Sequence, residues 1–245
     1  MNNPIIEIKN LTKHYGPKEA VKGIDLKIYP GELFVLLGPN GAGKTSTLKM
    51  LVGLLKPTSG TVLIDGCDLQ KDPITAKKKL SFVPDIPYIY DKLTPWELLR
   101  FVGKLYDLGP EIIQERGSRL LKFFELSDVQ DVLIEEFSHG MKQKVILSAS
   151  LIHEPQIFVL DEPMVGLDPI SIKSFKDLLK KKTKDGTTVI FSTHTLPLAE
   201  ELADRIAVIS GGKVVALGTL SELQKKSSGH GNLEQMFMQL IEKKD

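Results

Sequence analysis

A glycine-rich segment near the start of the chain has the spacing of a phosphate-binding loop. It follows the pattern G-x-x-x-x-G-K-[ST] and consists of Gly38, Pro39, Asn40, Gly41, Ala42, Gly43, Lys44 and Thr45, with Ser46 next. Glycines let such a backbone curl until several N–H groups point at phosphate oxygens, and a helix that follows adds its positive end. Lys44 is expected to reach the β- and γ-phosphates, and the Thr45 hydroxyl to bind magnesium. The segment therefore predicts binding of a nucleoside triphosphate.

Two adjacent carboxylates provide the second half of such a site. Asp161 and Glu162 directly follow the apolar run 157–160, which is typical of a buried strand. Because neighbouring side chains at a strand end point in different directions, the two acids can do different work. We expect Asp161 to hold magnesium, directly or through water, and Glu162 to polarise the water that attacks the γ-phosphate. His194 follows another apolar run, 189–191, where it is expected to sense the γ-phosphate.

Strands and helices must position these residues. The apolar run 33–37 before the loop predicts a central strand that is covered on both faces. Apolar residues at helical spacing predict a helix over 45–55, which ends before Pro57. The runs 157–160 and 189–191 predict two more buried strands, separated by a helix over 171–182. The carboxylates and the histidine thus follow directly on predicted core strands.

The flanking segments predict a second kind of sheet and a helical insertion. Ile6 and Ile8, and later 24–28, alternate with charged residues, as half-buried antiparallel strands do. Residues 84–155 carry helical spacing, and Thr94 begins a capping-box sequence with Pro95 at the first helical position. We expect one domain over 1–245. Its catalytic core and β-subdomain comprise 1–83 and 156–223, its helical subdomain comprises 84–155, and a loop and helix occupy 224–245.

The last part of the chain predicts a hairpin, a loop and a final helix. Gly211-Gly212 between two apolar runs is a two-residue hairpin signal. The segment 225–231 is expected to be a flexible loop. Apolar residues at i, i+3, i+4, i+7 and i+8 over 233–241 predict an amphipathic helix, which either closes the core of the chain or supports contact with a second copy.

Composition narrows the classes of partner. The 245 residues include 32 basic and 31 acidic side chains, so the net charge of +1 gives no global field for nucleic acid or for an acidic membrane surface. The single cysteine, Cys67, in the expected turn after a strand, excludes an intrachain disulfide. We find no secretion signal and no stretch of about 18 apolar residues that would span a bilayer. We therefore expect a cytoplasmic protein that meets a membrane only through another protein.

Four further motifs in order give the chain a family resemblance. Tyr15 lies in LTKHYG, Asp168 lies in VGLDP, and His194 is the third residue of STHTLPLAEELADR. Ser138 and Gly140 lie in FSHGMKQK, where Ser138 is a natural N-cap for a helix. With the phosphate loop, these motifs resemble the ATP-binding subunit of an ABC transporter over about residues 5–223. The resemblance implies an α/β fold, a P-loop NTPase of ABC type, with a mixed central sheet, an antiparallel β-subdomain and an inserted helical subdomain.

The same resemblance implies roles for these residues. Tyr15 would stack on adenine. Two copies would face each other head to tail, and each ATP would lie between the phosphate loop of one copy and the FSHGMKQK segment, the signature, of the other. Ser138 and Gly140 would then donate to the γ-phosphate across the interface, and Asp168 would lie in the adjoining loop. Asp85 takes the place of a glutamine that senses magnesium in the family. It can bind magnesium through water, although its reach is shorter.

The resemblance also implies partners. The form S-x-G-M-x-Q-K at 138–144 resembles the bacterial exporter branch, whose ATP-binding subunits work on the inner face of the membrane with separate permease subunits. A soluble ABC-type ATPase that acts in assembly or regulation shares every nucleotide motif and is the alternative. The apolar residues over 86–93 either pack beneath the helical insertion or form a groove for a cytoplasmic helix of the permease.

Overall fold

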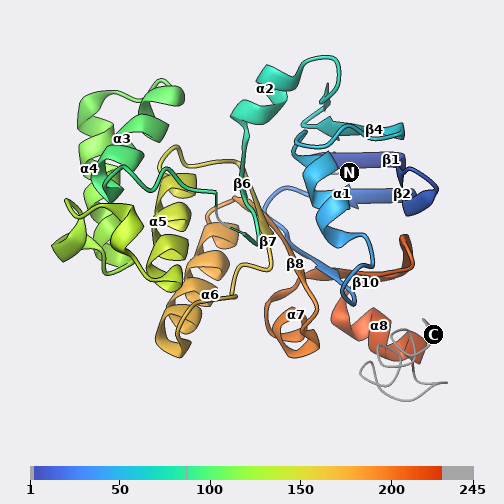
Figure 1. Ribbon diagram of the computed structural model, residues 1–245. Coiled ribbons are helices and arrows are strands. Elements are labelled where there is room, and N and C mark those ends of the chain that lie inside the picture. The colour runs from blue at the N-terminus through green and yellow to red at the C-terminus, as the bar shows by residue number, and fades with distance from the viewer. Residues whose placement is uncertain (1–2, 87, 228–245) are drawn as a thin grey trace.

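The computed structural model describes residues 3–86 and 88–227 (Figure 1). Its strands are β1 (Ile6–Tyr15), β2 (Lys18–Ile28), β3 (Leu33–Leu37), β4 (Ser59–Ile64), β5 (Cys67–Asp68), β6 (Leu80–Val83), β7 (Ile157–Asp161), β8 (Thr188–Thr193), β9 (Arg205–Ser210) and β10 (Lys213–Gly218). Its α-helices are α1 (Lys44–Leu51), α2 (Pro73–Lys78), α3 (Pro95–Leu105), α4 (Pro110–Phe123), α5 (His139–Leu151), α6 (Pro169–Lys184), α7 (Leu196–Leu202) and α8 (Leu220–Ser227). Two 3-10 turns, η1 (Ser127–Val129) and η2 (Ile134–Glu136), precede α5.

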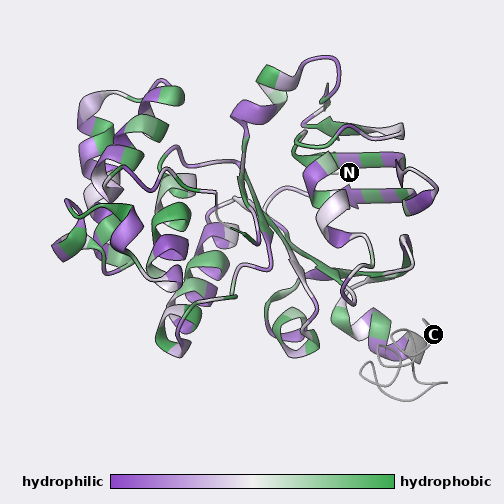
Figure 2. Cartoon of the chain, in the orientation of Figure 1, coloured by the Kyte–Doolittle hydropathy of each residue, from purple (hydrophilic) through white to green (hydrophobic). Residues whose placement is uncertain are grey.

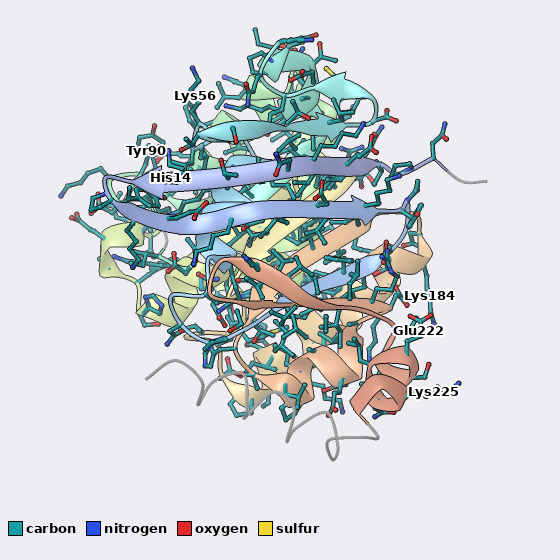
Figure 3. The ribbon with its side chains drawn as sticks, turned by 90° about the vertical axis from the view of Figure 1, so that its right-hand side faces the viewer. His14, Lys56, Tyr90, Lys184, Glu222 and Lys225 are labelled. Carbon is teal, nitrogen blue, oxygen red and sulfur yellow. The ribbon has the colours of Figure 1, made fainter. Side chains whose placement is uncertain are left out.

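The smaller sheet is antiparallel and has the strand order β2-β1-β4-β5. Ile6 faces Ile28 on one side and Ile64 on the other, and all three side chains are buried. Figure 2 shows hydrophilic and hydrophobic residues alternating along β1 and β2, which is the pattern of strands with one buried face. Seen after a quarter turn, these two strands cross the front of the molecule, with His14 near their hairpin end (Figure 3). The predicted antiparallel strands are confirmed.

The larger sheet has the order β10-β9-β3-β8-β7-β6 and is parallel except for β10, which pairs with β9 in the predicted hairpin. Its central strands β3, β7 and β8 are buried along their whole lengths. Successive side chains of a strand point to opposite faces, so each strand contributes to two cores. In β3, Leu33 and Val35 pack into one cluster, and Phe34 and Leu36 pack into the other.

The helical part of the chain lies on one side of this sheet, away from β1 and β2 (Figure 1). Thr94 begins α3 with a complete capping box: its hydroxyl accepts from Glu97 N at 3.2 Å, and the Glu97 carboxylate accepts from Thr94 N at 2.9 Å. Ser138 caps α5 by accepting from Met141 N at 3.3 Å. Both helix starts were predicted. Within the described residues, no helix is long and apolar enough to cross a bilayer.

Several predicted boundaries differ from the structure. The helix expected over 45–55 is α1 and ends at Leu51, because Gly53 takes a left-handed conformation (φ 69°) and Leu54 N and Leu55 N both donate to Lys49 O. Residues 225–227, which were expected to begin a flexible loop, belong to α8, and the rest of that segment lies outside the described residues. Cys67 opens β5 opposite Ile64 rather than lying in the preceding turn. The predicted helix over 233–241 lies outside the described residues.

Candidate functional site

A cavity of about 430 Å³ lies where the phosphate loop, the tip of the β1–β2 hairpin and the chain after β6 and β7 converge. It is lined by Tyr15, Lys18, Ala20, Asn40, Gly41, Ala42, Gly43, Lys44, Thr45, Ser46, Asp85 and Glu162. The loop sits between β3 and α1, and α1 packs against β2, β7 and β8. Two sheets and one helix thus position most of the residues that the sequence singled out.

The path of the phosphate loop requires glycine at two places. Gly43, which precedes α1, has φ 107°, and a Cβ there would lie 2.7 Å from Ala20 O. A Cβ on Gly38 would lie 2.2 Å from Ile209 O. The Gly38 N–H donates to Thr193 O at 3.2 Å, so the loop begins against the end of β8. These close approaches leave room only for backbone, and they fix where the loop leaves β3.

The Lys44 ammonium is held at the centre of this loop. The side chain is 6% exposed, and Nζ donates to Gly38 O at 2.8 Å and to Pro39 O at 3.3 Å. Nζ also lies 3.7 Å from Glu162 Oε1. A buried cation that is held by carbonyls and by one carboxylate can exchange these partners for phosphate oxygens at little cost in desolvation. Lys44 therefore lies where a triphosphate in the loop would need a positive charge.

Asp161 is fully buried at the end of β7. Its Oδ1 accepts a hydrogen bond from the Ser192 hydroxyl of β8, and the Thr45 hydroxyl is a further partner. Burial raises the pKa of the Asp161 carboxyl, and the hydrogen bonds from Ser192 and Thr45 oppose that shift. Its other oxygen, Oδ2, is buried without a hydrogen-bond partner. A buried, unpaired carboxylate oxygen beside a threonine hydroxyl suits a hard cation such as magnesium.

No group of three or more His, Cys, Asp or Glu side chains gathers in the described part of the chain to form a metal site. Asp161 and Thr45 offer only two oxygens, and Asp85, which also lines the cavity, is exposed. Magnesium normally completes its six ligands with water and substrate phosphates. The residues therefore fit a cation that arrives together with the nucleotide.

Glu162 is the residue that joins the two sides of the site. Its backbone is left-handed (φ 48°), which is strained for a residue other than glycine, and its N–H donates to the Ser192 hydroxyl at 3.1 Å. Its Oε1 lies 3.0 Å from His194 Nδ1 and 3.7 Å from Lys44 Nζ. The carboxylate is thus aimed between the phosphate loop and the histidine, as a base at the γ-phosphate would need to be.

Tyr15 lies at the open side of the cavity. Its ring is 47% exposed, its hydroxyl lies 3.3 Å from Ser46 Oγ, and Lys13 Nζ lies 5.4 Å from the ring centroid. An exposed aromatic face next to a phosphate loop can stack on a nucleobase. Lys18, across the turn from Tyr15, also lines the cavity, although the sequence had not singled it out. The only indication in the sequence was that Lys18 lies three residues after Tyr15.

Among the residues that the structure describes, the cavity lining does not include every predicted one. It omits Gly38, Pro39, Asp161 and His194, which nevertheless contact the lining residues Lys44, Thr45 or Glu162. Ser138, Gly140 and Asp168 lie elsewhere. Asp168 caps α6: its carboxylate accepts from Ile170 N at 3.1 Å, from Ser171 N at 2.9 Å and from the Ser171 hydroxyl at 2.5 Å. The hydrogen bond from the Ser171 hydroxyl is the main reason that the pKa of Asp168 is lowered to about 2. Within one chain, these residues form a second group.

This second group is closely packed. A Cβ on Gly140 would lie 2.6 Å from Gly166 O, and a Cβ on Gly166 would lie 2.4 Å from the His139 ring. Lys144 Nζ lies 3.7 Å from the Asp168 carboxylate and 3.3 Å from the Glu125 carboxylate. The start of α5 is therefore in direct contact with residues 162–168. Because this segment includes Glu162, the contact connects the second group to the cavity.

Ser192 is another functional candidate that the sequence did not single out. Its hydroxyl contacts Asp161 and the backbone of Glu162, and the parallel register places Ser192 directly opposite Asp161. A signal existed in the sequence, because both predicted strands end in polar residues. The register that makes Asp161 and Ser192 neighbours required the structure.

Comparison with known proteins agrees with this geometry. The family described as ABC transporter matches residues 21–165. The chain is 37% identical to the linearmycin resistance ATP-binding protein LnrL of Bacillus subtilis (strain 168) over 92% of its own length and 72% of that protein. It is also 37% identical to the SkfA peptide export ATP-binding protein SkfE of the same strain, over 86% of this chain and 87% of SkfE.

A solved structure described as the ATP binding subunit of an ABC transporter superposes with a TM-score of 0.91 at 31% identity, and the match covers 97% of this chain and 99% of that one. The predicted fold class is confirmed by this likeness and by the mixed sheet, the antiparallel sheet and the helical part seen here. The chain belongs to the ABC transporter family, as an ATP-binding subunit that hydrolyses ATP.

Proposed function

We propose that this subunit drives export of a drug-like or peptide substrate by ATP-dependent pairing of two copies beneath a separate membrane subunit. The observation that carries the proposal is the division of the motif residues into two groups. Lys44 and Glu162 line the cavity and His194 contacts Glu162, whereas Ser138 and Gly140 lie outside the cavity lining. A second copy that faces the first would bring its signature residues to the open side of that cavity.

The hydrolytic step uses the chain's own groups. Glu162 takes a proton from the attacking water as the water oxygen bonds to the γ-phosphorus, and the bond from that phosphorus to the β–γ bridging oxygen breaks. Lys44 compensates negative charge on the transferring group. His194, 3.0 Å from Glu162 Oε1, keeps the carboxylate aimed at the water.

We propose that Thr45 and Asp161 hold magnesium and that Asp85 contacts it through water. Magnesium, when bound with ATP, neutralises charge on the β- and γ-phosphates. The buried, unpaired Oδ2 of Asp161 supports this assignment. The exposed Asp85 side chain reaches the cavity from the chain after β6, which is compatible with a contact through water.

Replacing Glu162 by Gln tests the base and the pairing together. The amide cannot accept the proton but keeps the size of the side chain, so we expect ATP binding to persist and turnover to fall by about 100-fold or more, within the range of general-base catalysis. Size-exclusion chromatography with ATP should then show a stable dimer. Glu201→Gln, on α7 and paired with Lys176, is the matched control and should turn over ATP normally. Normal turnover in Glu162→Gln would remove Glu162 from the role of base.

The names of the relatives support export. LnrL is a resistance protein and SkfE a peptide export protein. We propose that this chain likewise acts at the cytoplasmic face of the membrane, which it contacts only through a permease subunit, and that it binds no nucleic acid. Its net charge of +1 gives no general attraction to polyanions.

We propose that the chain after β6 forms part of the surface that receives the permease. A groove of about 260 Å³ runs between that segment and α3, and its lining includes Tyr88, Tyr90 and Phe101. Ile89 and Leu93 pack against the core, whereas Ile86, Tyr88 and Tyr90 are largely exposed. The exposed members offer an apolar face that an amphipathic helix could cover.

Affinity purification from native membranes tests this partner. We expect an integral membrane protein to co-purify with the parent chain in mild detergent and to be lost with Tyr88→Asp. Ile74→Asp, an exposed apolar residue on α2, is the control and should retain the partner. Recovery of soluble proteins alone would favour the alternative of a soluble ATPase that acts in assembly or regulation.

A further inference from the structure

The hydroxyl of Ser192 lies at the junction of the two acidic residues of the site. β8 is buried along its whole length, and Ser192 is its fifth residue, opposite Asp161 of β7. The next residue, Thr193, accepts the hydrogen bond from Gly38 N that begins the phosphate loop. The end of β8 therefore touches both the loop and the carboxylates.

The direction of the hydrogen bonds at Ser192 follows from the chemistry of its partners. The Glu162 N–H can only donate, so the Ser192 oxygen accepts there, at 3.1 Å. The single hydroxyl hydrogen then points to Asp161 Oδ1, which accepts it. This bond occupies one carboxylate oxygen and leaves the buried Oδ2 without a hydrogen-bond partner.

The same hydroxyl supports a strained backbone. Glu162 adopts φ 48°, a conformation that costs a residue with a Cβ free energy and persists only where its surroundings fix it. The bond from Glu162 N to the buried Ser192 hydroxyl is itself partly buried, and it fixes the peptide that joins the two acids. One serine side chain thus holds both the carboxylate of Asp161 and the backbone that aims Glu162.

We infer that Ser192 is a positioning residue for magnesium: its hydroxyl holds Asp161 Oδ1, so that Oδ2 is the oxygen presented to the metal. The inference rests on the magnesium site of the proposed function. Without the hydroxyl, Asp161 can rotate about its terminal torsion, and the Glu162 N–H loses its buried acceptor. The consequence is weaker binding of magnesium with nucleotide, while binding of nucleotide without metal persists.

Titration with a non-hydrolysable ATP analogue, in magnesium and in EDTA, tests this role. The measured quantity is the factor by which magnesium strengthens binding. A hydrogen bond to a charged group corresponds to about a tenfold change or more. We therefore expect Ser192→Ala to reduce the magnesium factor by about tenfold and to change the affinity in EDTA by less than about twofold. Ser192→Thr keeps the hydroxyl on a strand that suits β-branched residues and should restore the factor.

A matched control lies on the same strand. Thr188 begins β8, is fully buried, and its hydroxyl bonds Gly31 N at 3.1 Å, far along the strand from Asp161. Thr188→Val removes a buried hydroxyl and should lower stability without changing the magnesium factor. An unchanged factor in Ser192→Ala, or the same loss in Thr188→Val, would overturn the role of Ser192. A parent chain that shows no magnesium factor would instead overturn the magnesium site itself, and this inference with it.

Discussion

At the scale of single residues, His153 is a partly buried titratable group that does not line the cavity. Its ring stacks on Tyr106, with centroids 3.6 Å apart and planes at 10°. Both ring nitrogens are buried, and neither has a well-aligned hydrogen-bond partner. Burial lowers the pKa of His153 from 6.5 to about 4. The folded chain therefore keeps this imidazole neutral where the unfolded chain would already protonate it.

This shift predicts a pH-dependent stability. Between pH 6.5 and about 4 the unfolded state binds more protons at His153 than the folded state, so the free energy of unfolding falls as the pH falls through this window. We expect His153→Phe, which keeps a ring for Tyr106, to show a shallower fall. Urea unfolding at several pH values measures it.

The matched control for that measurement is His14→Gln. His14 is a solvent-exposed histidine on the β1–β2 hairpin, 3.5 Å from Glu19. Its replacement removes a histidine but leaves His153 and its stacking on Tyr106 untouched, so the pH slope assigned to His153 should persist. Equal slopes for the parent and for His153→Phe would contradict the assignment of this slope to His153.

Residues of this kind mark the limit of prediction from sequence. The roles of Lys44 and Thr45 could be proposed because their motif is local and its spacing states the chemistry. Ser192 and His153 could not, since the first depends on the register of two strands that are distant in the chain and the second on which side chains cover it.

At the scale of elements, the start of α5 is fixed by its contact with the chain from 162 to 168. Alanine normally stabilises a helix relative to glycine by about 1 kcal/mol. At Gly140 the added Cβ would lie 2.6 Å from Gly166 O, a backbone atom that cannot rotate away. This close contact should therefore make alanine at position 140 destabilising, although alanine usually stabilises a helix.

We predict that Gly140→Ala lowers the free energy of unfolding by about 1–3 kcal/mol, the usual cost of overpacking. Gly103→Ala in α3 is the comparison, because its Cβ would meet only the side chain of Ile113, at 2.7 Å. That side chain can shift, so the cost should be smaller. Chemical denaturation measures both variants, and a more stable Gly140→Ala would show that α5 can move off the loop without cost.

Helix starts were easier to predict than helix ends. Thr94 and Ser138 are read correctly from sequence because a cap is a contact within four residues. The end of α1 was placed too late, since the left-handed turn at Gly53 and the bonds to Lys49 O depend on how the chain turns toward β4. A helix start can therefore be predicted from nearby residues, whereas a helix end also depends on contacts with the rest of the fold.

At the scale of the whole molecule, the separation of Ser138 from the cavity predicts complementation between two inactive variants. Lys44→Ala damages the cavity but leaves the signature intact, and Ser138→Arg does the reverse. A mixed pair contains one site in which an intact cavity faces an intact signature. We expect the mixture to hydrolyse ATP several-fold faster than either variant alone.

The controls for this experiment are the separate variants and a direct binding measurement. Lys44→Ala alone should bind ATP at least about tenfold more weakly than the parent, because a charged partner of the phosphates is lost. Lys49→Ala, on the same helix, should bind normally. A mixture no faster than the average of its components would mean that Ser138 acts within its own chain or does not act.

The fold class could be predicted because continuous apolar runs indicate the central strands, and the phosphate loop indicates that the run before it is one of them. The order β10-β9-β3-β8-β7-β6 was not predicted. Strand order depends on pairings between segments far apart in the chain, and an apolar run does not specify its neighbour.

The alternation of β3 between two cores has a consequence for how this protein can change through evolution. The side chains of Leu33 and Val35 pack with the helical part, and those of Phe34 and Leu36 pack with the antiparallel sheet and α1. The large sheet therefore separates two hydrophobic cores, one on each of its faces. Substitutions on the helical side can therefore change that side of the protein without altering the interior that supports the phosphate loop.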